Sequence, residues 1–482
     1  MLKYEIDCDN LEKPVIAEEK VTIIEQKEYN VEEIVEKLKN YFVNNHIDKE
    51  IHDKTVMLKV SLVFAVGDYN RVIMINTNYN LIAATAKTLE DLGAKRIYIA
   101  DGATVGPASY AYSVANLKRW LNQVELKKTK YLFLDEVPYA KVKFKNSPLD
   151  EMVGKECYPF KDLTLTYPAC LISNKSLTDK NGNRIEDEKL RKKFGYIDYF
   201  ISMPKLKANI FANITLSVKN NMGLIPRADR LRYHSRILHD MIACLYTIRP
   251  PDLIITDAIV SGMGQGPMEA DPCRSECIIC GKVGTAVDTV CSYLMDHDPL
   301  KIRHLKLLKN WGYGSLDLSQ IEVINKVVLE QKRDKILPFE FPDRHIEKIP
   351  NLKVYIGEDA CDSGCRGMLK AILDAYLKND KAELLDNHTF ILGNVDIPKE
   401  ELEEIDKRSC IVYGDCAEKY KEYGAFYHGC PPDYLVAMAL MMFQGHMGIN
   451  PWITYIKPLH YVWSWLRHIG ALVFGFRLWR KV

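Results

Sequence analysis

Cysteines beside glycines recur in three short segments of the last third of the chain. The segments are 357–365 with Cys361 and Cys365, 414–417 with Cys416, and 428–432 with Cys430. Each segment follows a predicted strand or precedes a predicted helix, and in a parallel sheet such turns share the carboxyl edge. Iron–sulfur clusters need thiolates, close backbone approach and N–H donors, which this arrangement can supply. Separately packed thiols and a zinc site are the alternatives, although only Cys361 and Cys365 have a short zinc-type spacing.

These three segments resemble the cluster-bearing small subunits of nickel–iron hydrogenases and respiratory complex I. Those subunits have a Cys-containing first loop, a Gly-x-Cys-Ala turn and a Gly-Cys-Pro-Pro loop around one [4Fe–4S] cluster. The resemblance covers about residues 352–443, and the first cysteine pair is spaced x3 rather than x2. The cluster ligands that it implies are Cys361, Cys365, Cys416 and Cys430.

A second group of cysteines has the pattern Cys273-x3-Cys277-x2-Cys280. The spacing is similar to the cluster-binding triad of radical S-adenosylmethionine enzymes. Residues 276–281, however, are predicted to form a strand, which would place Cys277 and Cys280 on opposite faces. We therefore expect buried thiols here, with a second cluster as the alternative.

The middle of the chain concentrates lysines after a predicted strand that ends at Pro204. Lys205, Lys207 and Lys219 follow, with the Thr215 hydroxyl and the Asn220 amide among them. Several ammonium groups and backbone N–H donors together are able to hold a carboxylate or a phosphate. The alternative is that these lysines are solvated on the surface. Asp101-Gly102, at the end of the predicted strand 96–100, is either part of a ligand edge or a plain turn.

This region resembles the domain-of-unknown-function family 362, a group with α/β architecture and no settled activity. The resemblance covers about residues 56–323 and is carried by the following matching segments: Pro204–Lys207, Thr215–Gly223, His234, Asp257–Ile259, Gly262–Pro267 and Ala286–Asp288. Such sequences commonly have Lys-Thr-His where this chain has Lys207-Ala208-Asn209. The candidate catalytic residues are Lys205, Lys207, Lys219, Asn220 and His234. Asp257 or Asp288 would position a lysine or a metal.

The overall composition argues against a nucleic-acid-binding protein and indicates a reducing compartment. The chain has 482 residues, with 65 Lys and Arg against 64 Asp and Glu. A net charge of +1 gives no reason to expect nucleic-acid binding. Thirteen cysteines and no recognisable secretory signal indicate a reducing compartment, so we expect a cytoplasmic protein.

The hydrophobic pattern predicts an α/β fold with two domains, each a mostly parallel sheet covered by helices. The predicted units are an N-terminal extension (1–55), the family 362-like domain (56–335), a flavodoxin-like iron–sulfur domain (345–445) and an amphipathic tail (446–482). A charged, Pro-containing stretch at 331–350 is the predicted linker.

The tail differs from the rest of the chain because residues 452–482 hold four of the six Trp, five basic residues and no acid. A basic, aromatic segment of this kind favours a peripheral helix on a membrane surface. A helix docked on protein and a membrane span are the alternatives, although Arg467 would be costly in a span.

Together these patterns predict an iron–sulfur redox protein. A C-terminal [4Fe–4S] cluster would pass electrons to a small anionic substrate, or to a redox partner protein, held by the lysine-rich domain. One alternative is a non-redox enzyme that acts on a carboxylate and has a structural cluster. The other is an assembly or adaptor protein of a membrane redox complex.

Overall fold

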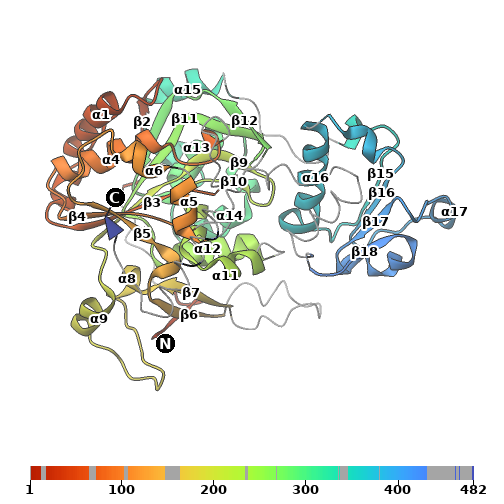
Figure 1. Ribbon diagram of the computed structural model, residues 1–482, viewed down its shortest axis with the longest axis horizontal. Helices are drawn as coiled ribbons and strands as arrows, with labels where there is room; N and C mark the ends of the chain where they lie inside the picture. Colours follow the sequence, from red (N-terminus) through yellow and green to blue (C-terminus); the bar gives the residue numbers. More distant parts are fainter. Residues whose placement is uncertain are drawn as a thin grey trace.

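The structure is a computed structural model. It describes residues 2–11, 18–63, 72–102, 107–114, 116–146, 163–233, 237–266, 269–334, 336, 346–378, 380–430, 432, 462, 466 and 480–481. The described part is an α/β protein with parallel-rich sheets, as the sequence predicts. A large body and a smaller C-terminal unit lie side by side (Figure 1).

The body is built on a twelve-stranded sheet whose main path runs β14-β2-β13-β11-β8-β3-β4-β5-β19. The strands β11, β8, β3, β4 and β5 at its centre are parallel. The strand bounds are β2 Lys20–Glu25, β3 Thr55–Val60, β4 Arg96–Asp101, β5 Thr129–Phe133, β8 Tyr199–Met203, β9 Lys205–Asn209, β10 Asn213–Thr215, β11 Leu253–Gln265, β12 Glu269–Cys273, β13 Cys277–Gly281, β14 Glu322–Ile324 and β19 Arg480–Lys481.

Two layers of helices cover this sheet. One layer packs on the face that carries Val56, Leu58 and Val60. It contains α1 Val31–Asn44, α2 Ile47–Ile51, α4 Tyr79–Asp91, α5 Ala108–Val114 and α6 Leu117–Leu121. The other packs on the face that carries Met57. It contains α8 Ala169–Ile172, α10 Ser217–Asn220, α12 Leu238–Ile248, α13 Gly284–Leu294, α14 Arg303–Asn310 and α15 Lys326–Arg333. The alternation along β3 follows from the two-residue period of a strand that is buried on both sides.

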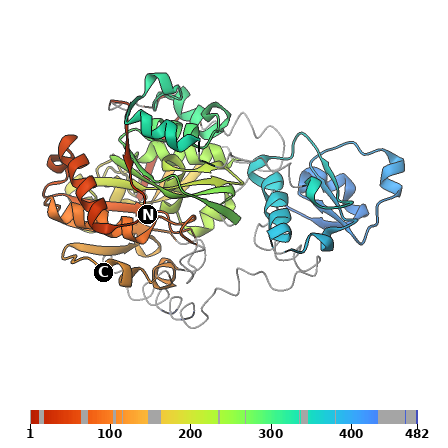
Figure 2. The ribbon, with the colours of Figure 1, turned by 90° about the horizontal axis from the view of Figure 1, so that it is seen from above.

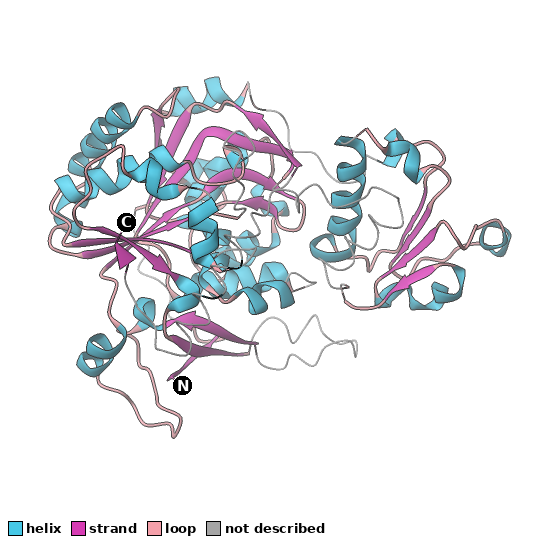
Figure 3. Cartoon of the chain, in the orientation of Figure 1, coloured by secondary structure: helices cyan, strands magenta, loops and turns pink. Residues whose placement is uncertain are grey.

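The N-terminal segment contributes strands rather than only packing on the body. The strand β2 lies inside the large sheet, between β14 and β13. A separate three-stranded sheet has the order β1-β6-β7, with β1 Leu2–Asp7, β6 Tyr139–Lys145 and β7 Leu163–Pro168. Residues 1–55, predicted to be an extension, therefore help to form both sheets. The short helices α9 Asp187–Phe194 and α11 Arg227–Arg232 complete the described body (Figure 3).

The C-terminal unit has four parallel strands in the order β15-β16-β17-β18. They are β15 Lys353–Ile356, β16 Thr389–Leu392, β17 Cys410–Tyr413 and β18 Ala425–Tyr427, with helices α16 Gly367–Lys378 and α17 Lys399–Glu403. This order is sequential, whereas in the expected flavodoxin-like order the first strand lies inside the sheet. The helix α16 faces the body and packs against β11 and β12 (Figure 2).

Little of the predicted tail lies within the described residues. Val462 and Leu466 are helical and 55% and 56% exposed, and Arg480–Lys481 pair antiparallel with β5. The remaining residues of 446–482 lie outside the described part. No helix in the described part has the length and apolar character needed to cross a membrane.

Candidate functional site

The candidate site lies at the carboxyl ends of the central strands. From β3 the chain continues to β4 and β5 on one side, whereas β8 and β11 lie on the other. The strand order therefore reverses between β3 and β8, and open α/β sheets bind ligands in the crevice at such a point. In the register of the sheet, Lys59 of β3 is flanked by Ala100 of β4 and Ser202 of β8. This edge gathers four buried lysines: Lys59, Lys205, Lys207 and Lys219.

Lys59 is held by a complete set of partners. Its ammonium group pairs with Asp101 at 2.8 Å and donates to the Asn220 side-chain oxygen at 3.0 Å. The Asn220 amide in turn donates to Ser202 Oγ at 2.9 Å, which ties β8 to the same cluster. Asp101 also accepts from the Leu62 and Gly102 backbone N–H groups. Asp101, the last residue of β4, is thus part of the charged edge.

Lys205 forms a second neutralised pair with Asp257, at 3.0 Å. Tyr29, from the segment before α1, completes this cluster. Its hydroxyl donates to Asp257 Oδ1 at 2.8 Å and accepts from Lys205 Nζ at 3.0 Å. Both members of the ion pair are fully buried, so the desolvation of each charge must be offset by these contacts. Asp257 therefore positions a lysine, one of the two roles that the sequence predicts for it.

Lys207 and Lys219 have no carboxylate partner among the described residues. Lys207 Nζ donates to the Ile75 carbonyl and lies 3.5 Å from Ser61 Oγ. Lys219, on α10, makes no ion pair in the described part of the chain. Thr215 lies directly opposite Lys207 in the β9–β10 ribbon, and its buried Oγ1 has no hydrogen-bond partner among the described residues. Two of the four lysines at this edge therefore lack an acidic partner in the part of the chain that the structure describes.

Burial and mutual repulsion disfavour the charged forms of these lysines. Burial lowers the pKa of Lys219 to about 8. The pKa of Lys207 lies well below its ordinary value, first because of burial and then because of the charges of Lys219 and Lys205. Burial also lowers the pKa of Lys59 and of Lys205, although Asp101 and Asp257 oppose that shift. An anion bound here would relieve the excess positive charge.

Two further residues predicted from the sequence, His234 and Asp288, are not among the lysines of this edge. His234 lies outside the described residues. Asp288 accepts hydrogen bonds from the Ser217 and Val218 backbone N–H groups at 2.8 and 3.1 Å, so it caps α10 and positions the helix that carries Lys219. Burial raises the pKa of Asp288 to about 7.

The predicted cysteine segments meet at the carboxyl edge of the second sheet. Cys361 follows β15, Cys416 follows β17 and Cys430 follows β18, whereas Cys365 lies in the π-helical turn Asp362–Arg366 that opens α16. Burial raises the pKa of the Cys365 thiol well above its ordinary value, and the charges of Cys361, Cys430 and Cys416 raise it further. The four cysteines are therefore neighbours in space.

Backbone contacts bring two of these loops together. The Asp415 N–H donates to the Gly429 carbonyl at 3.0 Å, and the Gly429 N–H donates to Asp415 Oδ1 at 2.6 Å. Gly414 has φ +88°, and a Cβ at this position would lie 2.8 Å from Cys365 Sγ. Only glycine combines this backbone conformation with such a close sulfur.

Cys277 and Cys280 lie on the strand β13, as predicted, and both are fully buried. They belong to the cores on opposite faces of the sheet. Burial raises the pKa of Cys277 to about 12. This placement favours the interpretation of Cys277 and Cys280 as buried thiols.

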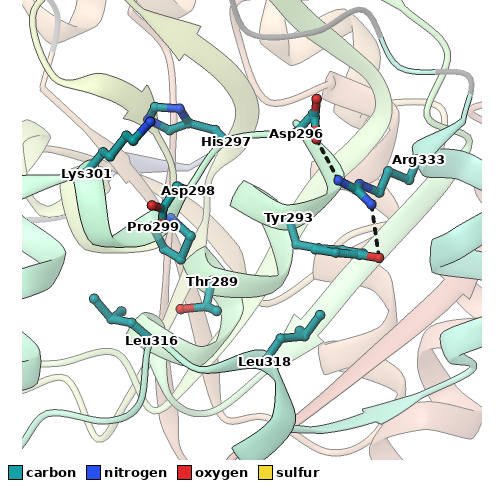
Figure 4. Close-up of a pocket in the computed structure, with 10 residues that line it drawn as sticks. All are labelled: Thr289, Tyr293, Asp296, His297, Asp298, Pro299, Lys301, Leu316, Leu318 and Arg333. Carbon is teal, nitrogen blue, oxygen red and sulfur yellow. Dashed lines mark hydrogen bonds and ion pairs between the residues drawn. The ribbon is translucent and has the colours of Figure 1, made fainter.

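A separate cavity of about 400 Å³ lies between α13, α15 and the segment 296–301 (Figure 4). Its Arg333 already pairs with Asp296 at 2.6 Å and contacts the Tyr293 hydroxyl at 3.2 Å. Asp296 therefore already neutralises this guanidinium, whereas Lys207 and Lys219 have no acidic partner among the described residues.

The lysine edge lies within a segment shared with known proteins. Residues 56–293 match one family model. That family is described as a domain of unknown function, DUF362. The match confirms this part of the resemblance, although it ends at residue 293 rather than 323, and it does not include the C-terminal unit. Thylakoid-associated protein sll1697 of Synechocystis sp. is 30% identical over 111 residues, which are 22% of this chain and 35% of that protein. The chain thus spans about a third of that relative. No solved structure matches.

Sequence reasoning missed three residues of the lysine edge. Lys59 lies in the buried strand β3, and a lysine inside such an apolar run is the one local signal for it. Arg230, which donates to the Gly102 carbonyl at 2.8 Å, and Tyr29 come from distant segments. Nothing in their local sequence indicates the contact.

Proposed function

We propose that this chain is a redox protein that binds a [4Fe–4S] cluster through Cys361, Cys365, Cys416 and Cys430. The body would hold the small anionic substrate, or the acidic group of a partner protein, at Lys207 and Lys219. The observation that carries the proposal is the convergence of the four thiols at one sheet edge.

The residues at this edge fit such a cluster. Four thiols come from three short segments, and the space beside Cys365 is kept open by Gly414, where a Cβ would crowd the sulfur. No three Cys, His, Asp or Glu side chains in the described ranges are arranged to hold a single metal ion. A [4Fe–4S] cluster takes four thiolates, which is the number that these segments supply. When bound, the cluster would supply single-electron transfer.

The packing of the two units supports a functional link between the two sites. The helix α16 begins directly after Cys365 and packs against β11 and β12. The strand β11 also pairs with β9, where Gly262 lies opposite Lys207. A single pair of strands therefore contacts both the helix that follows the thiols and the strand that carries the lysines.

Iron and sulfide measurements on the anaerobically purified full chain test the proposal. We expect about four irons and about four acid-labile sulfides per chain, and an electron paramagnetic resonance signal after reduction with dithionite. Cys416→Ala and Cys430→Ala should lose both iron and signal. Cys410→Ala, which removes a buried thiol at the start of β17, is the matched control and should retain them.

Two other results of the iron measurement would change the conclusion. Absence of iron, or zinc alone, would refute the cluster. About eight irons per chain would indicate a second cluster and direct attention to Cys273, Cys277 and Cys280.

A peripheral membrane location is a second proposal, favoured by the exposed apolar pair Val462 and Leu466 one helical turn apart. The relative named as thylakoid-associated is compatible with it. We expect the chain to float with vesicles that contain phosphatidylglycerol, and the variant Val462→Ser/Leu466→Ser to float less. Equal flotation of the two proteins would contradict the proposal.

A further inference from the structure

We infer that Lys219 is a nucleophile that forms an imine with the carbonyl group of a 2-oxo carboxylate, while Lys207 and Thr215 hold the carboxylate. This inference rests on the lysine edge as the substrate site of the proposed function. It does not depend on an iron–sulfur cluster.

The first support is that only two of the four lysines form ion pairs with an aspartate. Lys59 and Lys205 are each neutralised by an aspartate at 2.8 and 3.0 Å. Those two ammonium groups are engaged in structural ion pairs, so they are poor candidates for chemistry. Lys207 and Lys219 have no carboxylate partner in the described part of the structure, and the charge of Lys219 acts on Lys207. They are the two lysines of the edge that no described carboxylate neutralises.

The second support is access. Lys207 is fully buried, and its ammonium group is directed to the Ile75 carbonyl and Ser61. Lys219 is the most exposed of the four, at 9% of its surface. A small carbonyl compound that enters this edge would therefore meet the Lys219 amine more readily than the other three.

The third support is the place for a carboxylate. Thr215 and Lys207 are directly opposed in the antiparallel β9–β10 ribbon, so their side chains project from the same face. The unpartnered, buried Thr215 hydroxyl is able to donate one hydrogen bond, and the Lys207 ammonium group is able to donate another. Lys219 follows Thr215 by four residues, on the short helix α10 that Asp288 caps.

The chemistry needs a neutral amine, and the surroundings supply one. Burial lowers the pKa of Lys219 to about 8. At pH 8 roughly 100-fold more of such an amine is neutral than of an ordinary lysine with a pKa near 10.4. The amine nitrogen bonds to the carbonyl carbon, and the carbonyl oxygen leaves as water with the two amine hydrogens. The step requires neither an oxidant nor a reductant.

Trapping with sodium borohydride tests the inference on the full chain, with pyruvate as the probe. Reduction converts the imine into a stable carboxyethyl-lysine, which peptide mass spectrometry locates. We expect Lys219 to be modified at least roughly ten times faster than any exposed lysine, because of its larger neutral fraction. Lys219→Arg should abolish the fast modification, and Lys326→Arg, at an exposed helix position, should leave it unchanged.

The wild-type map by itself decides the question if Lys219→Arg fails to fold. Modification spread evenly over exposed lysines, or preferential modification of Lys207, would overturn the inference. Acetone, a methyl ketone like pyruvate but without the carboxylate, should modify Lys219 more slowly than pyruvate, and an equal or faster rate would refute the carboxylate site. Trapping in Cys416→Ala should match the wild type, so failure of the cluster and failure of the imine are distinguishable.

Discussion

At the scale of single residues, the buried ion pair between Lys205 and Asp257 is the most demanding feature of the edge. Both side chains are fully buried, so removing one partner leaves an uncompensated charge. We expect Asp257→Asn to lower the free energy of unfolding by about 3–5 kcal/mol, measured by urea denaturation. Glu404→Gln, which breaks the exposed pair with Lys353, should cost less than about 1 kcal/mol. Equal costs at the two sites would contradict this assignment.

The stacked pair His239 and His304 gives a prediction for acid stability. Their Nδ1 atoms are 2.8 Å apart, and burial lowers the pKa of His239 to about 3. An unfolded histidine binds a proton below about pH 6.5, whereas folded His239 stays neutral. The unfolded state therefore binds more protons, and stability falls as the pH is lowered from about 6.5 towards 3.

Replacing His239 should weaken this dependence on pH. We expect the wild type to lose on the order of 3 kcal/mol more than His239→Gln between pH 7 and pH 4, in urea denaturation at each pH. The exposed His46 provides the control, since His46→Asn should keep the wild-type slope. Parallel curves for the wild type and His239→Gln would rule out this role of the pair.

At the scale of elements, the turn after β17 is the sensitive part of the cysteine edge. Gly414→Ala would place a methyl group 2.8 Å from Cys365 Sγ at a positive φ, so we expect lower iron content as well as a loss of about 1–2 kcal/mol. Gly182→Ala has a similar φ of +86° with nothing within 4 Å of the new carbon. It should lose stability to a similar or smaller degree and keep its iron. Full iron in Gly414→Ala would count against the edge as a ligand site.

Elements were predictable where the pattern is local. The helix Val31–Asn44 has apolar residues at helical spacing, and the strands Thr389–Leu392 and Cys410–Tyr413 are short, mostly apolar runs. Such patterns can be located from the sequence alone. The insertion of β2 between β13 and β14 was not predictable, because strand pairing over hundreds of residues leaves no local period. The contact of Tyr29 with the lysine edge was not predictable for the same reason, whereas Lys205, Lys207, Lys219 and the cysteines were predicted from residue type and from their position near strand ends.

At the scale of the whole molecule, the C-terminal unit packs directly against the core of the body. Leu369, Leu373 and Tyr376 of α16 belong to the same buried hydrophobic cluster as the core of the body. The cysteine edge, α16 and the β11–β12 pair therefore form a continuous contact that ends at the strand pairing of Lys207. A ligand that binds only the folded state of one part stabilises the elements packed on it.

From this contact we predict that iron bound at the cysteines slows backbone hydrogen exchange in the part of the body that packs on α16. In iron-loaded chain, backbone amides of Glu269–Cys273 should exchange hydrogen more slowly than in the iron-free chain, because α16 is held by the ligated segment before it and covers β12. Amides of β6, in the separate three-stranded sheet, provide the internal reference and should not change. Slowed exchange in both places would indicate general stabilisation, and no change in β12 would show that the two sites are independent. Selective protection of β12 would show that α16 transmits iron binding at the cysteine edge to the strand on which this helix packs.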